Sequence, residues 1–268
     1  MRRALVTGGT SGIGLSFARA LAAEGRPVIL VARERARLDA VAADLTRDFG
    51  CDVETVIADL ATRPGQDAVM QRLGRGDVSV LVNNAGFSLK TPIVGGDNAL
   101  ADSAWEVMGR APRVLADAAA TAMLSAPASP DEPRGLIITI ASASALTRQD
   151  SYSALKTYVL ALTEVLAIEL DGTGINVTAV LPGWTRTEFH SRGKQGVSSI
   201  PRFLWLDPDR VAIEGLRDAR RGKVLSVPSS RYKVLVGLLS VLPSGAVRFL
   251  SQAVSGRRRR DRVAVEGS

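Results

Sequence analysis

Short apolar runs alternate with segments of helical periodicity, and this alternation limits the possible folds more than any other feature. The runs at 28–32 and 136–140 are rich in valine, isoleucine and leucine, which is typical of strands buried on both faces. Strands that alternate with helices imply right-handed crossovers between parallel neighbours. The sequence therefore predicts an α/β fold: a doubly wound, mostly parallel, seven-stranded sheet with helices on both faces. Expected strands are 4–7, 28–32, 53–58, 78–82, 135–141, 175–181 and 224–227, and expected helices are 12–24, 33–49, 64–73, 97–124 with a break near Pro112, 152–170 and one that starts at Asp207-Pro208.

A glycine-rich segment joins the first expected strand to the first helix. It reads Thr7-Gly8-Gly9-Thr10-Ser11-Gly12-Ile13-Gly14. Glycines let the backbone approach a pyrophosphate closely, and a helix N-terminus offers free N–H groups with partial positive charge. Glycines also serve ordinary turns, but the position between a strand and a helix favours a phosphate loop.

The residue at the end of the second strand indicates which dinucleotide this loop would hold. An NAD site usually has an acid there to bind the ribose 2′-hydroxyl. This chain has Arg33, whose guanidinium would pair with the extra 2′-phosphate of NADP. The alternative is a solvated arginine at the start of a helix. We therefore expect NADP (as NADPH) as the cofactor.

A tyrosine and a lysine four residues apart carry the candidate chemistry. Tyr152 and Lys156 fall on one face of the helix expected over 152–170. A phenol ionises near pH 10, and a nearby cation is expected to lower that pKa. Ser142 follows a buried strand at the sheet edge where such folds bind ligands, so its hydroxyl can bind a substrate oxygen. The three residues predict acid–base chemistry on a carbonyl or alcohol.

Together these motifs resemble the short-chain dehydrogenase/reductase family, whose fold is Rossmann-type. The motifs that carry the resemblance run from residue 3 to about 227 and are Thr7-Gly8-x-x-x-Gly12-x-Gly14, Asn83-Asn84-Ala85-Gly86, Ser142, Tyr152-x-x-x-Lys156 and Pro182-Gly183. The resemblance implies an NADPH-preferring oxidoreductase in which Tyr152 transfers the proton, Lys156 holds the ribose hydroxyls and Ser142 orients the carbonyl. The cofactor-binding residues that it implies are Thr7, Gly8, Thr10, Ser11, Gly12, Ile13, Gly14, Arg33, Asp59 and Leu60 near the adenine, Asn83, Ala85, Gly86, Tyr152, Lys156, Pro182, Gly183, Thr185 and Thr187.

Two positions depart from the family pattern. Ser142 lies ten residues before Tyr152, where many members have thirteen, and Ser144 is a nearer competitor for its role. Met108 stands where many members have an asparagine that anchors a water for proton relay, and a thioether anchors water poorly. Three functions remain open: a reductase or dehydrogenase, a catalytically impaired NADP-binding sensor or scaffold, and an isomerase or dehydratase on the same fold.

The segment at about 184–222 is expected to form a substrate lid. Its large apolar residues predict an apolar pocket for a ketone, a steroid-like molecule or a 3-oxoacyl chain, although each could instead pack the lid onto the core. They are Trp184, Phe189, Ile200, Phe203, Leu204 and Trp205. His190, the one histidine, is expected at the surface, and no spacing predicts a metal site.

The charge of the chain is concentrated toward its end. The formal net charge is +7, yet residues 189–268 hold 16 Lys/Arg against 6 Asp/Glu. We expect one domain over 1–256, with a helical extension at 229–256 and a basic disordered tail at 257–268. The extension is expected to cover the cleft or a dimer face, or to contact an anionic membrane weakly. Nucleic-acid binding is not expected, because no stacking aromatics accompany the arginines.

The remaining bulk features favour a cytoplasmic protein. A single cysteine, Cys51, cannot form an internal disulfide, and no apolar run reaches the roughly 20 residues of a membrane span. The N-terminus lacks the apolar core of a signal peptide. Helices 111–124 and 152–170 are expected to pair between subunits of a dimer or tetramer, by the same resemblance.

Overall fold

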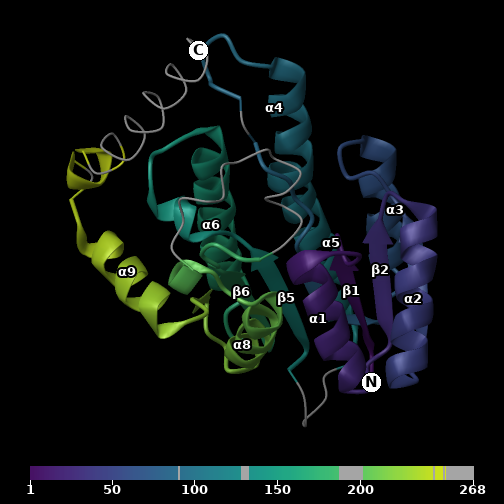
Figure 1. Cartoon of the computed structure of the whole chain (residues 1–268). Coiled ribbons are helices and arrows are strands. Elements are labelled where there is room, and N and C mark those ends of the chain that lie inside the picture. The colour runs from purple at the N-terminus through teal and green to yellow at the C-terminus, as the bar shows by residue number, and fades with distance from the viewer. Residues whose placement is uncertain (90, 128–132, 187–201, 244, 250, 252–268) are drawn as a thin grey trace.

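The computed structural model describes residues 1–89, 91–127, 133–186, 202–243, 245–249 and 251. Seven strands form one parallel sheet in the order β3-β2-β1-β4-β5-β6-β7 (Figure 1). The strands are β1 (Arg3–Thr7), β2 (Val28–Ala32), β3 (Val53–Ile57), β4 (Val78–Asn83), β5 (Gly135–Ile140), β6 (Ile175–Val180) and β7 (Leu225–Ser226). The predicted doubly wound sheet is confirmed.

Burial on both faces explains why the strands read as continuous apolar runs. In β1, Ala4, Leu5 and Val6 are all fully buried. Successive side chains point to opposite faces, so Ala4 and Val6 join one core cluster while Leu5 joins the other. Neither face of the central strands reaches water, which leaves no position for a polar alternation.

Helices cover both faces of this sheet. On one face α1 packs against α8, and on the other α3 packs against α5 (Figure 1). The helices are α1 (Gly12–Ala23), α2 (Arg35–Phe49), α3 (Arg63–Leu73), α4 (Asn98–Trp105), α5 (Ala111–Ser125), α6 (Ser151–Glu169), α8 (Pro208–Arg220) and α9 (Ser230–Val241). Short 3-10 turns, η2 (Ala143–Leu146) and η4 (Arg202–Leu204), join them. Among the described residues, no helix is long and apolar enough to cross a membrane.

The helix starts follow local sequence signals. The Asp150 carboxylate caps α6 by accepting from the Ser153 backbone N–H at 2.8 Å, and the Ser153 hydroxyl accepts from the Asp150 N–H at 3.0 Å. Asp207 caps α8 ahead of Pro208, as the sequence predicted. The α6 cap fixes the start of the helix that carries Tyr152 and Lys156.

The break expected near Pro112 is a π-helical turn rather than an interruption. The turn η1 (Glu106–Arg110) joins α4 to α5, and the Ala111 N–H donates to the Glu106 carbonyl five residues back. Pro112 has no N–H to donate to Met108, so the usual hydrogen-bond ladder cannot pass through it. In the π-helical turn the hydrogen bonds span five residues instead of four, so the turn accommodates one residue more than an α-helical turn. Such turns are frequent at functional sites.

Candidate active site

The polar residues of the predicted site gather at the C-terminal edge of the sheet. Thr7 ends β1, Asn83 ends β4, and Ser142 and Pro182 follow β5 and β6 by two residues each. The strand order reverses between β1 and β4, because β2 lies on one side of β1 and β4 on the other. Open α/β sheets bind ligands in the crevice at such a reversal. The topology therefore brings the predicted motifs to one edge.

The glycine loop is fastened to the end of β4. The Asn84 amide donates to the carbonyls of Thr7 and Gly8, at 2.9 and 3.2 Å, and the Thr7 hydroxyl accepts from the backbone N–H groups of Asn84 and Ala85. A Cβ atom on Gly14 would lie 2.3 Å from both the Asn84 amide nitrogen and the Gly8 carbonyl oxygen. Only glycine fits there, so the loop stays open at the start of α1.

This loop has the shape that a pyrophosphate needs. Gly8 and Gly12 have positive φ angles of 63° and 53°, which turn the backbone at low cost. Ser11 is the N-cap of α1, and its side chain makes no capping bond. The first N–H groups of α1 are thus free of a side-chain cap and suit an anion. Thr10 is buried beside them, while Ile13 packs partly buried against the core.

Two arginines follow β2, where the adenosine end of the cofactor is predicted to bind. Arg33 is exposed just after β2, where the sequence placed it. Arg37, one turn into α2, donates from Nε to the Thr10 carbonyl at 3.2 Å. Arg37 was not among the predicted site residues, and no motif in the sequence identified it.

Two predicted adenosine-side residues are engaged in local hydrogen bonds. The Asp59 carboxylate accepts from the Ala61 N–H at 3.0 Å, and neighbouring Leu60 is buried. The Asn83 amide donates to the Pro112 carbonyl at 3.1 Å and is buried. The prediction for Asn83 therefore rests on its backbone atoms, and its neighbour Asn84 holds the glycine loop.

The structure brings Ser142, Tyr152 and Lys156 together. Ser142 is hydrogen-bonded to the Tyr152 hydroxyl, and the Lys156 ammonium lies 5.7 Å from the centre of the Tyr152 ring. Lys156 Nζ donates to the Ile140 carbonyl at 2.8 Å, just before Ser142. The Ser144 hydroxyl donates to Ser142 Oγ at 2.8 Å. Ser144 thus supports Ser142 rather than replacing it.

Burial controls the ionisation of both groups. It raises the pKa of Tyr152; the nearby Asp150 carboxylate adds to this, and the Ser142 hydrogen bond opposes it. Burial also lowers the pKa of Lys156 to about 8. The expectation that Lys156 lowers the pKa of Tyr152 is therefore wrong for this structure. The two groups share one water-poor site, which disfavours both charged forms.

Met108 occupies the space beside the Asn83-Asn84-Ala85-Gly86 turn. It lies in the π-helical turn and is 1% exposed. A Cβ atom on Gly86 would come within 3.1 Å of its sulfur. The thioether fills the gap between this turn and α6 by apolar packing, in keeping with the adaptable shape of methionine.

The C-terminal extension supports the segment after β6. The Tyr232 hydroxyl, from α9, accepts from the Trp184 N–H at 3.1 Å and donates to the Leu204 carbonyl at 2.9 Å. A Cβ atom on Gly183 would lie 1.8 Å from the Tyr232 ring, so Gly183 must be glycine. The Ala143 N–H binds the Pro182 carbonyl, and the Thr185 hydroxyl donates to the Gly183 carbonyl. No motif or spacing in the sequence identified Tyr232 as a site residue.

Part of the predicted lid lies outside the described residues, including Thr187, Phe189, His190 and Ile200. Within the described part, the ring centres of Trp184 and Trp205 lie 6.1 Å apart, while Phe203 is 60% exposed. A cavity of about 270 Å³ adjoins them and has a mixed aromatic, serine and charged lining. The apolar substrate pocket stays a prediction.

The comparisons establish the family. A family model described as short chain dehydrogenase matches residues 2–197. A Streptomyces virginiae protein whose name describes it as a ketoacyl reductase of a monensin polyketide synthase is 37% identical over 266 residues, which is 95% of each chain. The human protein named very-long-chain 3-oxoacyl-CoA reductase is 31% identical over 69% of this chain and 60% of its own. A solved short-chain dehydrogenase from Sphingobium yanoikuyae, in complex with NADPH, superposes with a TM-score of 0.79 at 30% identity, over 91% of this chain and 97% of that one. The chain belongs to the short-chain dehydrogenase/reductase family of oxidoreductases.

Proposed function

We propose that this protein is an NADPH-dependent reductase of ketones, with 3-oxoacyl thioesters as the favoured class. One observation carries the proposal: the Tyr152 hydroxyl is hydrogen-bonded to Ser142, beside the Lys156 ammonium, at the edge that also holds the glycine loop. The substrate class is supported by the names of the ketoacyl and 3-oxoacyl reductases to which the chain is similar.

The residues suit the reduction direction. Burial keeps the Tyr152 phenol protonated, so it is a proton donor at neutral pH. An alkoxide that forms from a carbonyl is a far stronger base than a phenolate, so proton transfer from Tyr152 is downhill. Ser142 accepts hydrogen bonds from the Ser144 hydroxyl and N–H, so its own proton points toward Tyr152 and would be shared with a carbonyl oxygen bound beside it. Bound NADPH would supply the hydride.

Lys156 contributes a positive charge only while it is protonated. Its pKa of about 8 means that the ammonium is lost as the pH rises above that value. Below that pH the ammonium stabilises negative charge on Tyr152 after proton transfer and offers N–H donors to ribose hydroxyls. Turnover should therefore fall on the alkaline side with an apparent pKa near this value.

The cofactor preference rests on Arg33 and is tested by substitution. The exposed Arg33 guanidinium would pair with the 2′-phosphate of NADPH, while Arg37 braces the loop at Thr10. Arg33→Ala should weaken NADPH binding about tenfold or more and leave NADH binding unchanged, because a charge-assisted hydrogen bond is lost. The measurement is calorimetric titration of both cofactors.

The matched control is Arg35→Ala, since Arg35 is also exposed on the same turn but pairs with Asp39 at 3.1 Å. Equal loss in both variants would show a general electrostatic effect. A wild-type preference for NADH would overturn the cofactor assignment. It would not bear on the roles proposed for Tyr152 and Lys156.

A catalytically impaired NADP-binding protein is the second candidate, and Met108 favours it. The thioether is buried at the position where the family resemblance implies an asparagine that holds a water. The two functions differ in an assay of NADPH oxidation against 3-oxoacyl thioesters and apolar ketones. Turnover supports the reductase, whereas tight NADPH binding without turnover of any substrate class supports the binding protein.

We also propose a homodimer or homotetramer with α5 and α6 at a subunit contact. These helices expose apolar side chains that a partner copy would cover: Leu124 is 41%, Val165 is 52% and Ile168 is 76% exposed. Exposed apolar patches commonly mark protein interfaces. Light scattering of the purified chain measures the mass in solution, and a monomer would contradict the proposal.

A further inference from the structure

The outer face of α9 is apolar although α9 already packs on the protein through its inner face. Tyr232 and Val236 are buried against the core, at 5% and 7% exposure. The opposite side carries Val234, Leu235, Leu238, Val241 and Leu242, of which Val234, Leu238 and Val241 are 59–78% exposed. We name these five residues the α9 face. The spacings of four and three residues place Val234, Leu238 and Val241 in one row.

Apolar and aromatic residues adjoin both ends of this face. Phe203, which is 60% exposed, lies under the Arg231 guanidinium at 5.8 Å from the ring centre, at the start of α9. Phe249 is 71% exposed in the helical turn that follows. Figure 1 shows α9 at the periphery of the molecule, on the α8 side of the sheet. A helix that is apolar on both sides is rarely left in water.

The segment that carries α9 is rich in basic residues. Residues 219–251 contain six Lys/Arg and no Asp or Glu. On the helix and the turn after it, Arg231, Lys233 and Arg248 are exposed. Two acids face them from the start and middle of α8: Glu214, which lies 4.0 Å from Lys233 and is already bonded to Arg210, and Asp207, which lines the same cavity as Arg231. The α9 face is thus apolar with a basic border.

We propose that the α9 face docks this protein on an anionic lipid surface. The helix is twelve residues long, which is enough to lie in the interface and too short to cross a bilayer. Anionic head groups attract the basic border, and the apolar row enters the boundary of the acyl chains. A second copy of the chain fits less well, because two such faces would bring like charges together.

The test is co-sedimentation of the full chain with lipid vesicles at physiological salt. Vesicles of phosphatidylcholine with phosphatidylglycerol should bind the protein, vesicles of phosphatidylcholine alone should bind it several times more weakly, and high salt should release it. Leu238→Ser/Val241→Ser should reduce binding about tenfold, because two apolar side chains no longer leave water. Lys233→Gln/Arg248→Gln should reduce binding to the anionic vesicles about thirtyfold, at roughly 1 kcal/mol for each of the two charges.

A matched control removes exposed apolar side chains at the other end of the sheet. Phe49→Ser/Ile57→Ser, in α2 and β3, should bind vesicles like the wild type. NADPH affinity and an unfolding midpoint close to those of the wild type would show that the α9 variants are folded. No vesicle binding, or binding that the α9 variants leave unchanged, overturns the proposal. A lower mass of Leu238→Ser/Val241→Ser by light scattering without lipid also overturns it, because a second copy then covers the face.

Discussion

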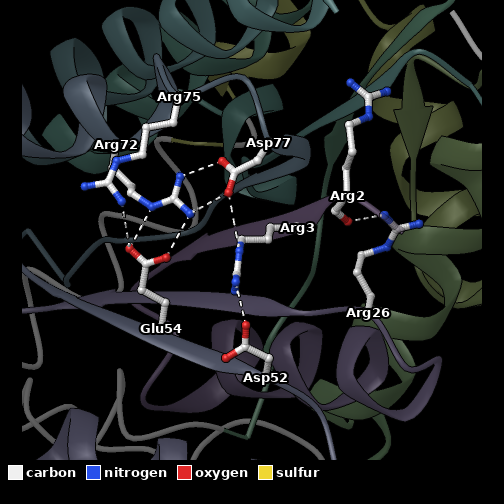
Figure 2. A network of polar contacts seen from close by, with 8 residues as sticks. All are labelled: Arg2, Arg3, Arg26, Asp52, Glu54, Arg72, Arg75 and Asp77. Atoms are coloured by element: carbon white, nitrogen blue, oxygen red, sulfur yellow. Dashed lines mark hydrogen bonds and ion pairs between the residues drawn. The ribbon is translucent and has the colours of Figure 1, made fainter. Parts of the chain in front are cut away.

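Buried charges are paired with opposite charges at one edge of the sheet and not at the other. At the N-terminal edge, Arg72 of α3 is 4% exposed in its side chain and forms paired hydrogen bonds with Glu54 and Asp77, at 2.7–2.9 Å (Figure 2). Arg3 links Asp52 and Asp77 in the same network. At the C-terminal edge, Lys156 is equally buried but bonds to a neutral carbonyl.

The pKa shifts follow from this difference. The Arg72 guanidinium lowers the pKa of Glu54 and of Asp77, and these carboxylates raise the pKa of Arg72. Burial instead lowers the pKa of Lys156 and raises that of Tyr152. Matched charges stabilise the fold at one edge. At the other edge the uncompensated groups lower the stability, and they are the groups to which we assign the proposed chemistry.

The largest predicted effect breaks the compensated edge. Arg72→Met leaves Glu54 and Asp77 without their partner, and we expect a loss of about 3 kcal/mol in the free energy of unfolding. The loss is at the low end for a buried network because both carboxylates also reach solvent. Urea denaturation measures it. Arg75→Met is the control, since Arg75 is 68% exposed and lies 4.0 Å from Glu54; an equal loss there would contradict the account.

The second prediction concerns the uncompensated edge and has the opposite sign. Lys156→Met should stabilise the cofactor-free protein by about 1–2 kcal/mol at pH 7, because a charge penalised by burial is removed and one hydrogen bond is lost. The folded pKa lies below the unfolded value, so wild-type stability rises with pH between about 8 and about 10.5. The advantage of the variant should shrink across that window in urea denaturation. A destabilised variant at pH 7 would contradict the comparison.

The smallest effect sharpens the comparison at acid pH. The lowered pKa of Asp77 means that its contribution is full above its unfolded pKa, about 4, and is lost as the pH falls through the folded value. Asp77→Asn should cost about 1 kcal/mol at pH 7, a discounted figure because this carboxylate is 44% exposed. Its thermal midpoint should also depend less on pH in the acid range. Asp39→Asn, in an exposed pair with Arg35, should change neither property.

Most of the fold could be predicted from the sequence because both faces of the sheet are buried. The strand at 28–32 has the predicted bounds, and the others differ by a few residues at most. The π-helical turn before Pro112 was expected only as a break. A missing N–H identifies the position of such a defect but not the form that the helix takes there.

The sequence predicted which residues would gather at the candidate site, but it did not predict most of the contacts among them. The topology brings Ser142, Tyr152 and Lys156 together from separate elements. Sequence spacing could not decide that Asn84, rather than Asn83, holds the glycine loop, or that Tyr232 would reach Gly183. The direction of the Tyr152 pKa shift was missed because burial is a tertiary property that a local residue pair does not reveal.

The most direct test of the account is turnover and unfolding of Tyr152→Phe, measured side by side. We predict that NADPH oxidation with a 3-oxoacyl thioester falls by about a hundredfold or more, while NADPH affinity and unfolding free energy stay close to wild type. Tyr158→Phe, six residues along α6 and packed on Trp105, should retain turnover. Full activity in Tyr152→Phe, or an inactive wild type that still binds NADPH, would contradict the assignment of this edge as a catalytic site.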